Sequence, residues 1–126
     1  SIMSSDRWKL YDEFAEGNGM TVDEVTDDVA VSSMTVEKRH LNGVGVCQGG
    51  ALFTLADLAM AAVTNQRGMS VSTDANIRFL SAAHEGDRLV CRIRMIKDGR
   101  LPVLDGDIRC GDRVVAVVGG RDYRIN

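Results

Sequence analysis

The sequence lacks the features that mark membrane, secreted and metal-bound proteins. It has no apolar run long enough to cross a bilayer, and its start, SIMSSDRWKLYDEF, lacks the basic and then apolar segments of a signal peptide. Its three cysteines are odd in number and form no CxxC pair, which favours free thiols in a reducing compartment. With only two histidines and no second ligand at a suitable spacing, we expect no metal site. We therefore predict a cytoplasmic protein without metal or cofactor.

The sequence also has no large excess of charge of one sign. The 126 residues include 15 basic and 18 acidic side chains, a net charge of −3, so no clustered basic surface for nucleic acid is expected. With 44% hydrophobic residues and one proline, the composition is that of a globular protein. This length can bury a core without disulfides, and we expect residues 1–126 to form a single domain.

The order of apolar residues predicts one long helix among shorter elements. Residues 6–19 predict a short amphipathic helix that stops at Gly17, and residues 20–40 predict a hairpin around an Asp-Asp turn. A glycine-rich loop then leads into a helix over about residues 49–66. The apolar face of the first helix would comprise Trp8, Leu10, Tyr11, Phe14 and Ala15. Strand-like runs follow the long helix, in the segments 69–80, 87–99, 101–112 and 113–125.

A helix that is apolar almost all round has to be buried. A twisted antiparallel sheet wrapped around it is an economical cover, so we predict an α+β fold. The strands after the helix are not separated by further helices, which argues against a doubly wound parallel fold. A single small sheet leaves its edge strands open, and pairing with a second copy would cover them.

Two adjacent glycines, Gly49 and Gly50, stand where the long helix begins. They allow a tight turn and a close approach to bare backbone N–H groups. The first-turn N–H groups of a helix lack internal partners, and the helix dipole there favours negative charge. Such a place suits a carbonyl oxygen that gains charge during acyl transfer. Glycines are common before helices, so the pair alone is weak evidence for a site.

One acid, Asp57, interrupts the otherwise apolar run ALFTLADLAMAAV. It shares a helical stripe with Thr54, Ala61 and Thr64, at spacings of 3, 4 and 3 residues. This stripe is either a solvated edge of the helix or a cleft in which Asp57 is the only strong nucleophile or base. In a cleft, partial burial would raise the pKa of Asp57 and let it act near neutral pH.

Distance limits what one chain can do with these residues. Gly49 and Asp57 are eight residues apart, which is about 12 Å along a helix. Two antiparallel copies of the helix across a two-fold axis would bring Asp57 of one chain to Gly49 of the other. If the two groups work together, the spacing predicts a homodimer.

The stretch LNGVGVCQGGALFTLADLAMA resembles the signature of hotdog-fold acyl-CoA thioesterases of the phenylacetic-acid-degradation type. That signature contains Asn, a short glycine-containing loop, His-Gly-Gly and then Leu-Ala-Asp on a helix. The stretch STDANIRFLSAAHEGDRLVCRIRMIKDGR is similar to the strand, turn and strand that follow, so the likeness covers most of residues 35–124. It implies a strongly bent antiparallel sheet around one central helix, and subunit pairs that share active sites.

The resemblance also implies roles for individual residues. Asp57 matches the catalytic carboxylate, as nucleophile or as general base on water, and the sequence does not choose between them. Gly49, with Gly50 beside it, matches the backbone donor that polarises the thioester carbonyl. Asn42 matches the polar residue near the attacking water or the carbonyl. Gln48 is a departure, because the family has His there: an amide can orient groups but cannot carry a proton near neutral pH.

Further residues are candidates for contact with the substrate. Ser72 and Thr73 either line the acyl pocket or simply begin a strand, and Ala61 lies on the stripe of Asp57. Arg100, in KDGR, is the arginine we expect at the phosphates of coenzyme A, although a solvated turn residue is the plainer interpretation. Cys47 has no evident His partner, so we interpret it as a small apolar residue.

Three functions compete. The leading one is a thioesterase that hydrolyses an acyl- or aryl-CoA to the free acid and CoA. The alternative is a dimeric, non-catalytic acyl-CoA-binding domain, which Gln48 favours. A hydratase of the same fold would pair its acid with a nearby His, and Asp57 is followed by LAMAAVTNQ instead. The acyl group, and the choice between dimer and tetramer, stay open.

Overall fold

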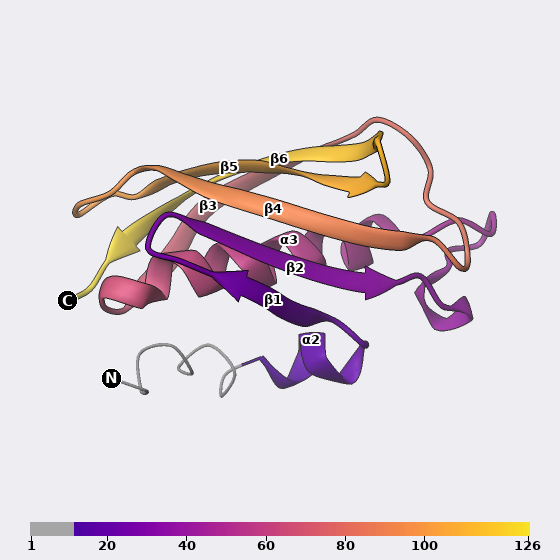
Figure 1. The fold of residues 1–126 in the computed structure, drawn as a ribbon, viewed down its shortest axis with the longest axis horizontal. Helices are drawn as coiled ribbons and strands as arrows, with labels where there is room; N and C mark the ends of the chain where they lie inside the picture. Colours follow the sequence, from indigo (N-terminus) through magenta and orange to yellow (C-terminus); the bar gives the residue numbers. More distant parts are fainter. Residues whose placement is uncertain (1–11) are drawn as a thin grey trace.

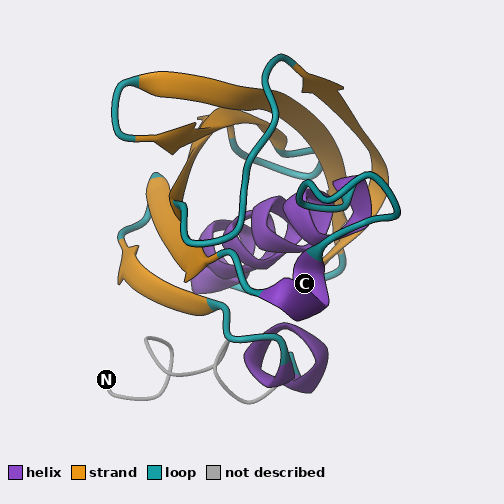
Figure 2. Ribbon diagram, turned by 90° about the vertical axis from the view of Figure 1, so that its right-hand side faces the viewer, coloured by secondary structure: helices purple, strands orange, loops and turns teal. Residues whose placement is uncertain are grey.

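The computed structural model describes residues 12–126, which form one antiparallel sheet curled around a long helix (Figures 1 and 2). The elements are α2 (Glu13–Gly17), β1 (Thr21–Val25), β2 (Val29–Thr35), η2 (Lys38–His40), α3 (Gly49–Thr64), η3 (Asn65–Arg67), β3 (Ser70–Phe79), β4 (Arg88–Lys97), β5 (Val103–Cys110) and β6 (Arg113–Arg124). The six strands lie in the order β1-β2-β4-β5-β6-β3, and every neighbouring pair is antiparallel. The predicted α+β architecture is confirmed.

Helix α3 fills the concave side of the sheet, as its apolar sequence predicted (Figure 2). Most of its residues are small or straight-chain helix formers, and its long side chains pack against β2 and β4 above all. The hydroxyl of Ser32 in β2 donates to the carbonyl of Leu55 at 2.7 Å, which fixes the helix to the sheet. The buried residues of α3 are Leu52, Leu55, Ala56, Leu58, Ala59, Met60, Ala62, Val63 and Thr64.

The strands supply the rest of the core by alternation. In β4, every second side chain from Leu89 to Met95 is buried and the side chains between them are exposed, the period of two that a half-buried strand requires. The predicted hairpin at residues 20–40 is β1 and β2, and all four later strand runs are present. The long helix ends at Thr64 and continues as the short helix η3.

The predicted N-terminal helix is confirmed in part. Helix α2 ends at Gly17, as expected, and Ala15 is buried. The expected apolar position Phe14 is 69% exposed, because α2 turns it away from the core. Trp8, Leu10 and Tyr11 lie outside the described residues. No helix within residues 12–126 is long and apolar enough to cross a membrane.

The two sheet edges differ. Strand β1, at one edge, carries the exposed acids Asp23 and Glu24 and a register shift, devices that discourage pairing with another strand. Strand β3, at the other edge, also has exposed charges and a register shift, but it is exposed along most of its length and includes the half-exposed side chains of Val71 and Phe79. An open, partly apolar edge such as β3 favours pairing with another strand.

A cluster of charged side chains lies at the C-terminal end of α3. Asp98, in the β4–β5 turn, accepts hydrogen bonds from Arg67 of η3 and from Arg124 of β6, the latter at 2.8 Å. Arg124 also donates to the carbonyl of Thr64 at 3.0 Å, at the last turn of α3. The backbone N–H of Gly99, followed by the two guanidinium groups, lowers the pKa of Asp98.

We predict that Asp98→Asn lowers the free energy of unfolding at pH 7, by about 1 kcal/mol because water screens these partly exposed groups. The depressed pKa of Asp98 in the folded state means that its stabilisation is present above the unfolded pKa and is lost as pH falls through the folded pKa. Urea unfolding of both proteins should therefore differ at pH 7 and converge in acid. Asp112→Asn, in an exposed turn, is the matched control, and an equal loss at both pH values would contradict this account.

Candidate functional site

Helix α3 begins with two backbone donors that the fold leaves unused. Gln48 is the N-cap, and its carbonyl accepts from the N–H groups of Ala51 and Leu52 at 3.0 and 3.3 Å. Among residues 12–126, the N–H groups of Gly49 and Gly50 have no hydrogen-bond partner. Because the helix dipole adds positive potential here, this end of α3 can bind an oxygen that carries negative charge.

Both glycines lie close to the ends of neighbouring side chains. A β-carbon on Gly49 would lie 2.9 Å from Cζ of Phe79, and one on Gly50 would lie 2.5 Å from Oε1 of Gln48. The ring of Phe79, at the end of β3, thus rests against the bare backbone of Gly49, although it remains 54% exposed. Larger residues would displace the side chains that frame the two donors.

Asn42 holds the loop that leads into the helix. Its Oδ1 accepts from the N–H groups of Val44 and Val46 at 3.0 and 3.2 Å, and its own N–H donates to the carbonyl of Val46. The amide oxygen is therefore occupied, and only the Nδ2 group is left to donate to a ligand. Asn42 lies beside the helix start, as the sequence predicted.

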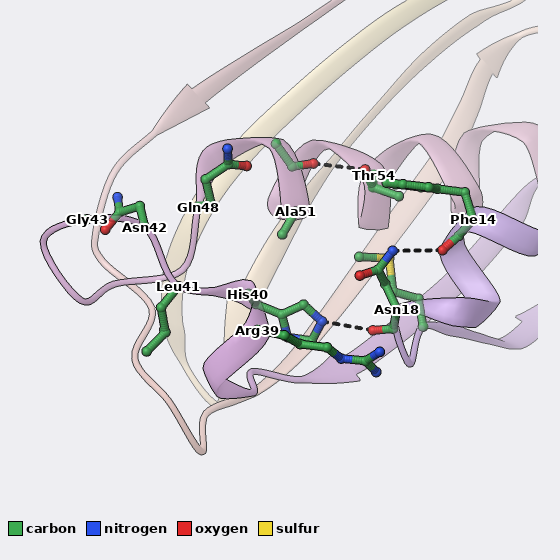
Figure 3. A pocket seen from close by; sticks show the side chains of 12 residues that line it. Phe14, Asn18, Arg39, His40, Leu41, Asn42, Gly43, Gln48, Ala51 and Thr54 are labelled. Carbon is green, nitrogen blue, oxygen red and sulfur yellow. Dashed lines mark hydrogen bonds between the residues drawn. The ribbon is translucent and has the colours of Figure 1, made fainter.

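Two hollows flank the helix start, and Asn42 borders both (Figure 3 shows the larger). The larger is about 590 Å³ and opens on the side of Gly50, between α2, η2 and α3. The smaller is about 450 Å³ and opens on the side of Gly49, against Phe79 and mostly apolar side chains. The larger hollow is lined by Phe14, Asn18, Met20, Arg39, His40, Leu41, Asn42, Gly43, Gln48, Gly50, Ala51 and Thr54.

Asp57 lies two turns further along α3 and borders neither hollow. It is half-buried, on the side of the helix that the sheet leaves uncovered. Partial burial raises its pKa, and the nearby carboxylates of Asp12 and Asp122 raise it further. A carboxylate with a raised pKa is a stronger base than an ordinary aspartate.

The stripe that contains Asp57 is shorter than the sequence suggested. Thr54 is half-buried, with its hydroxyl donating to the carbonyl of Gly50 at 2.8 Å, and Ala61 is exposed. Thr64 is buried and donates to the carbonyl of Met60 at 2.9 Å, so its inclusion in the open stripe was wrong. The reason is that the first residues of β3 and the end of β6 cover the last turn of α3: Asn65 accepts from the N–H of Ser70, and Arg124 donates to Thr64.

The other predicted residues lie toward the opposite end of α3. Ser72 and Thr73 are exposed on β3, and the hydroxyl of Thr73 donates to the carbonyl of Arg121 at 3.0 Å. The carbonyl of Arg100 accepts from Arg124, which itself contacts the end of α3. The guanidinium of Arg100 lies over the ring of Tyr123, 5.6 Å from its centroid.

The predicted site residues therefore lie in two separate groups on the chain. The helix start with Asn42, Gln48 and the two glycines forms one group, and the exposed residues of β3 with Arg100 form the other. Asp57 stands between them, about 12 Å from Gly49 by its position along the helix. The structure of a single chain does not bring the acid and the donors together.

Two residues at the helix start went unrecognised in the sequence. The ring of Phe79 covers Gly49, and the ring of His40 lies in the wall of the larger hollow. Phe79 is distant in sequence from the helix start, and His40 is separated from it by a loop. No local motif marks either residue. Cys47 behaves as expected: it is buried, and burial raises the pKa of its thiol to about 11.

Comparison with known proteins identifies the family. The family model described as the thioesterase superfamily matches residues 44–103. The acyl-coenzyme A thioesterase PaaI of Escherichia coli is 33% identical over 117 residues, which is 90% of this chain and 84% of that protein.

Solved structures show the same architecture. The E. coli PaaI protein from the phenylacetic acid degradation operon superposes with a TM-score of 0.89 and 31% identity, over 99% of this chain and 93% of its own. A hypothetical thioesterase protein of Streptococcus pneumoniae TIGR4, solved with coenzyme A, superposes with a TM-score of 0.80 and 26% identity, over 86% and 90% of the two chains. The chain therefore belongs to the thioesterase superfamily, in the PaaI-type group of hotdog-fold proteins.

Proposed function

We propose that this thioester hydrolase cleaves acyl- or aryl-CoA to the free acid and coenzyme A, at sites that two copies build together. The observation that carries the proposal is the pair of free N–H groups at the start of α3, with a half-buried acid eight residues along the same helix. The E. coli relative, named for its action on acyl-coenzyme A, supports the choice of substrate class.

The helix start would bind the reacting carbonyl. The thioester oxygen accepts from the N–H of Gly49, with the N–H of Gly50 beside it, where the dipole of α3 adds to the positive potential. As a nucleophile attacks, this oxygen gains negative charge, and its hydrogen bonds strengthen. The donors thus stabilise the transition state more than the ground state.

Asp57 of the second copy would supply the nucleophile. It acts either as a base that takes one proton from water, so that the hydroxyl oxygen bonds to the carbonyl carbon, or by attacking that carbon itself. In both cases the carbon–sulfur bond then breaks, and the thiolate of CoA leaves and takes up a proton. If Asp57 attacks directly, the acyl group is left bonded to it as an anhydride, and water then hydrolyses this anhydride to the free acid and restores the carboxylate. The raised pKa of Asp57 supports either role near neutral pH.

The open edge of the sheet offers a seam for the second copy. Strand β3 carries the apolar side chains of Val71, Ala75 and Ile77 beside the charged Asp74 and Arg78, and it runs along α3 from the end of the helix to its start. Pairing of two β3 edges would satisfy their free backbone groups and lay the two helices antiparallel. Ser72, Thr73 and Arg100 of one copy would then face the helix start of the other.

Gln48 distinguishes this chain from the family pattern. Its side chain lies against Gly50, at the border of the larger hollow, where its amide can hold the substrate or a water by hydrogen bonds. Since an amide does not titrate, proton transfer is left to Asp57 and solvent. The same residue favours a second candidate function, an acyl-CoA-binding dimer without turnover, which would bind a thioether analogue of acyl-CoA and hydrolyse nothing.

Replacement of Asp57 tests the acid. We expect Asp57→Asn to lower thiol release from acyl- and aryl-CoA substrates about a hundredfold or more, because the amide can neither accept the proton nor attack. The measurement is thiol release across a substrate panel, with Asp112→Asn as the control for loss of one exposed carboxylate. Equal rates for Asp57→Asn and wild type would reject Asp57 as the catalytic carboxylate.

Replacement of Gly49 tests the backbone donor. Gly49→Pro removes the N–H, while proline suits the first position of a helix and Gln48 already has the extended conformation that a following proline requires. We expect a fall in kcat of about a hundredfold, the effect of losing one such donor. Gly49→Ala adds the same β-carbon against Phe79 but keeps the N–H, and should retain most activity. Equal losses in the two variants would mean that the ring contact, not the donor, matters.

A further inference from the structure

His40 joins three segments at the helix start. The residue is 4% exposed; Nδ1 accepts from the N–H of Glu37 at 2.9 Å, and Nε2 lies 2.8 Å from the carbonyl of Asn18. Its own carbonyl accepts from the N–H of Gln48, the N-cap of α3, at 2.8 Å. One residue thus connects the end of α2, the turn after β2 and the first residues of α3 (Figure 3).

These contacts determine the form of the ring. Because the N–H of Glu37 points into Nδ1, this nitrogen carries no proton, and the proton sits on Nε2 and is donated to Asn18. Both nitrogens are occupied, so His40 cannot stand in for the family histidine that Gln48 replaces. Its role is therefore not proton transfer.

His40 contacts segments that line the larger hollow. Asn18 follows α2, which brings Phe14 to the hollow, and Gln48 borders the two glycine donors. The neighbouring charged side chains of Glu37 and Arg39 pair with each other at 2.8 Å. Arg39 also donates to the carbonyl of Gly17 at 2.6 Å, so it gives α2 a second tie beside that of His40.

We infer that His40 is a positioning residue for substrate, an inference that rests on the proposed function. Its Nε2 bond to Asn18 holds the α2 wall against which the substrate lies. Its Nδ1 bond to Glu37 holds the short helix η2, and through the carbonyl of His40 the position of Gln48 and Gly49. The first contact serves binding, and the second serves the alignment of the backbone donors.

Two substitutions separate these contacts. In His40→Asn the amide oxygen reaches the Nδ1 position but nothing reaches Asn18, so we expect KM to rise about tenfold with kcat nearly unchanged. In His40→Gln the amide group reaches Asn18 but no acceptor faces Glu37, so we expect kcat to fall about tenfold with KM nearly unchanged. His84→Asn, at the exposed histidine in the β3–β4 turn, is the control and should match wild type.

A merely structural role would give both variants the same change, and that result would overturn the inference. A second measurement uses the wild type, in which ¹⁵N spectra of the imidazole should show the Nε2–H form and should shift when the thioether S-benzyl-CoA is added. An Nδ1–H form, or no shift at saturation, would also overturn it.

If wild type hydrolysed no thioester, the proposed function would fail by itself. The inference would still be tested by S-benzyl-CoA affinity, which should weaken in His40→Asn and not in His40→Gln.

Discussion

When a sheet encloses a helix, the N–H groups of the first helical turn still have no hydrogen-bond partner within the helix. In this protein the sheet covers the long sides of α3, and the sequence around the helix start leaves Gly49 and Gly50 without side chains. The apolar run that drives folding therefore also places two oriented donors beside surface hollows, Gly50 at the larger and Gly49 at the smaller. Helix α3 therefore contributes both to the core and to the candidate site.

The second constraint is length. A rigid helix keeps Asp57 about 12 Å from Gly49 whatever the loops do, so no local movement within one chain can close the site. The open β3 edge and the uncovered stripe of α3 lie together on one side of the chain, which is where a second copy would complete both. In this account, assembly is a requirement of the chemistry and also the means by which an exposed strand edge is protected.

Most of the fold follows from periodicity that can be read in the sequence. The alternation from Leu89 to Met95 predicted β4, and the continuous apolar run predicted α3, while the burial of Asp57 stayed open between a solvated edge and a cleft. The start of the helix at Gly49 and Gly50 was also predicted, because the residues that begin a helix are neighbours in the sequence. Those predictions needed only neighbours along the chain.

What the sequence did not predict depends on contacts between distant segments. Thr64 was placed on an open stripe, but β3 and Arg124 of β6 cover it. Phe79 is 30 residues from Gly49, and no motif signals that its ring rests on that backbone. The contacts of His40 with Asn18 span 22 residues, so an isolated histidine gave no sign of its position.

The most direct test of the shared site is complementation between two inactive chains. Asp57→Asn and Gly49→Pro chains, carrying different tags, would be co-expressed and the mixed dimers purified by both tags. If each site takes its acid from one chain and its donors from the other, a mixed dimer has one intact site and one doubly altered site, and it should recover about half of the wild-type activity. Mixed dimers as inactive as either parent would contradict the account and would place acid and donors within a single chain.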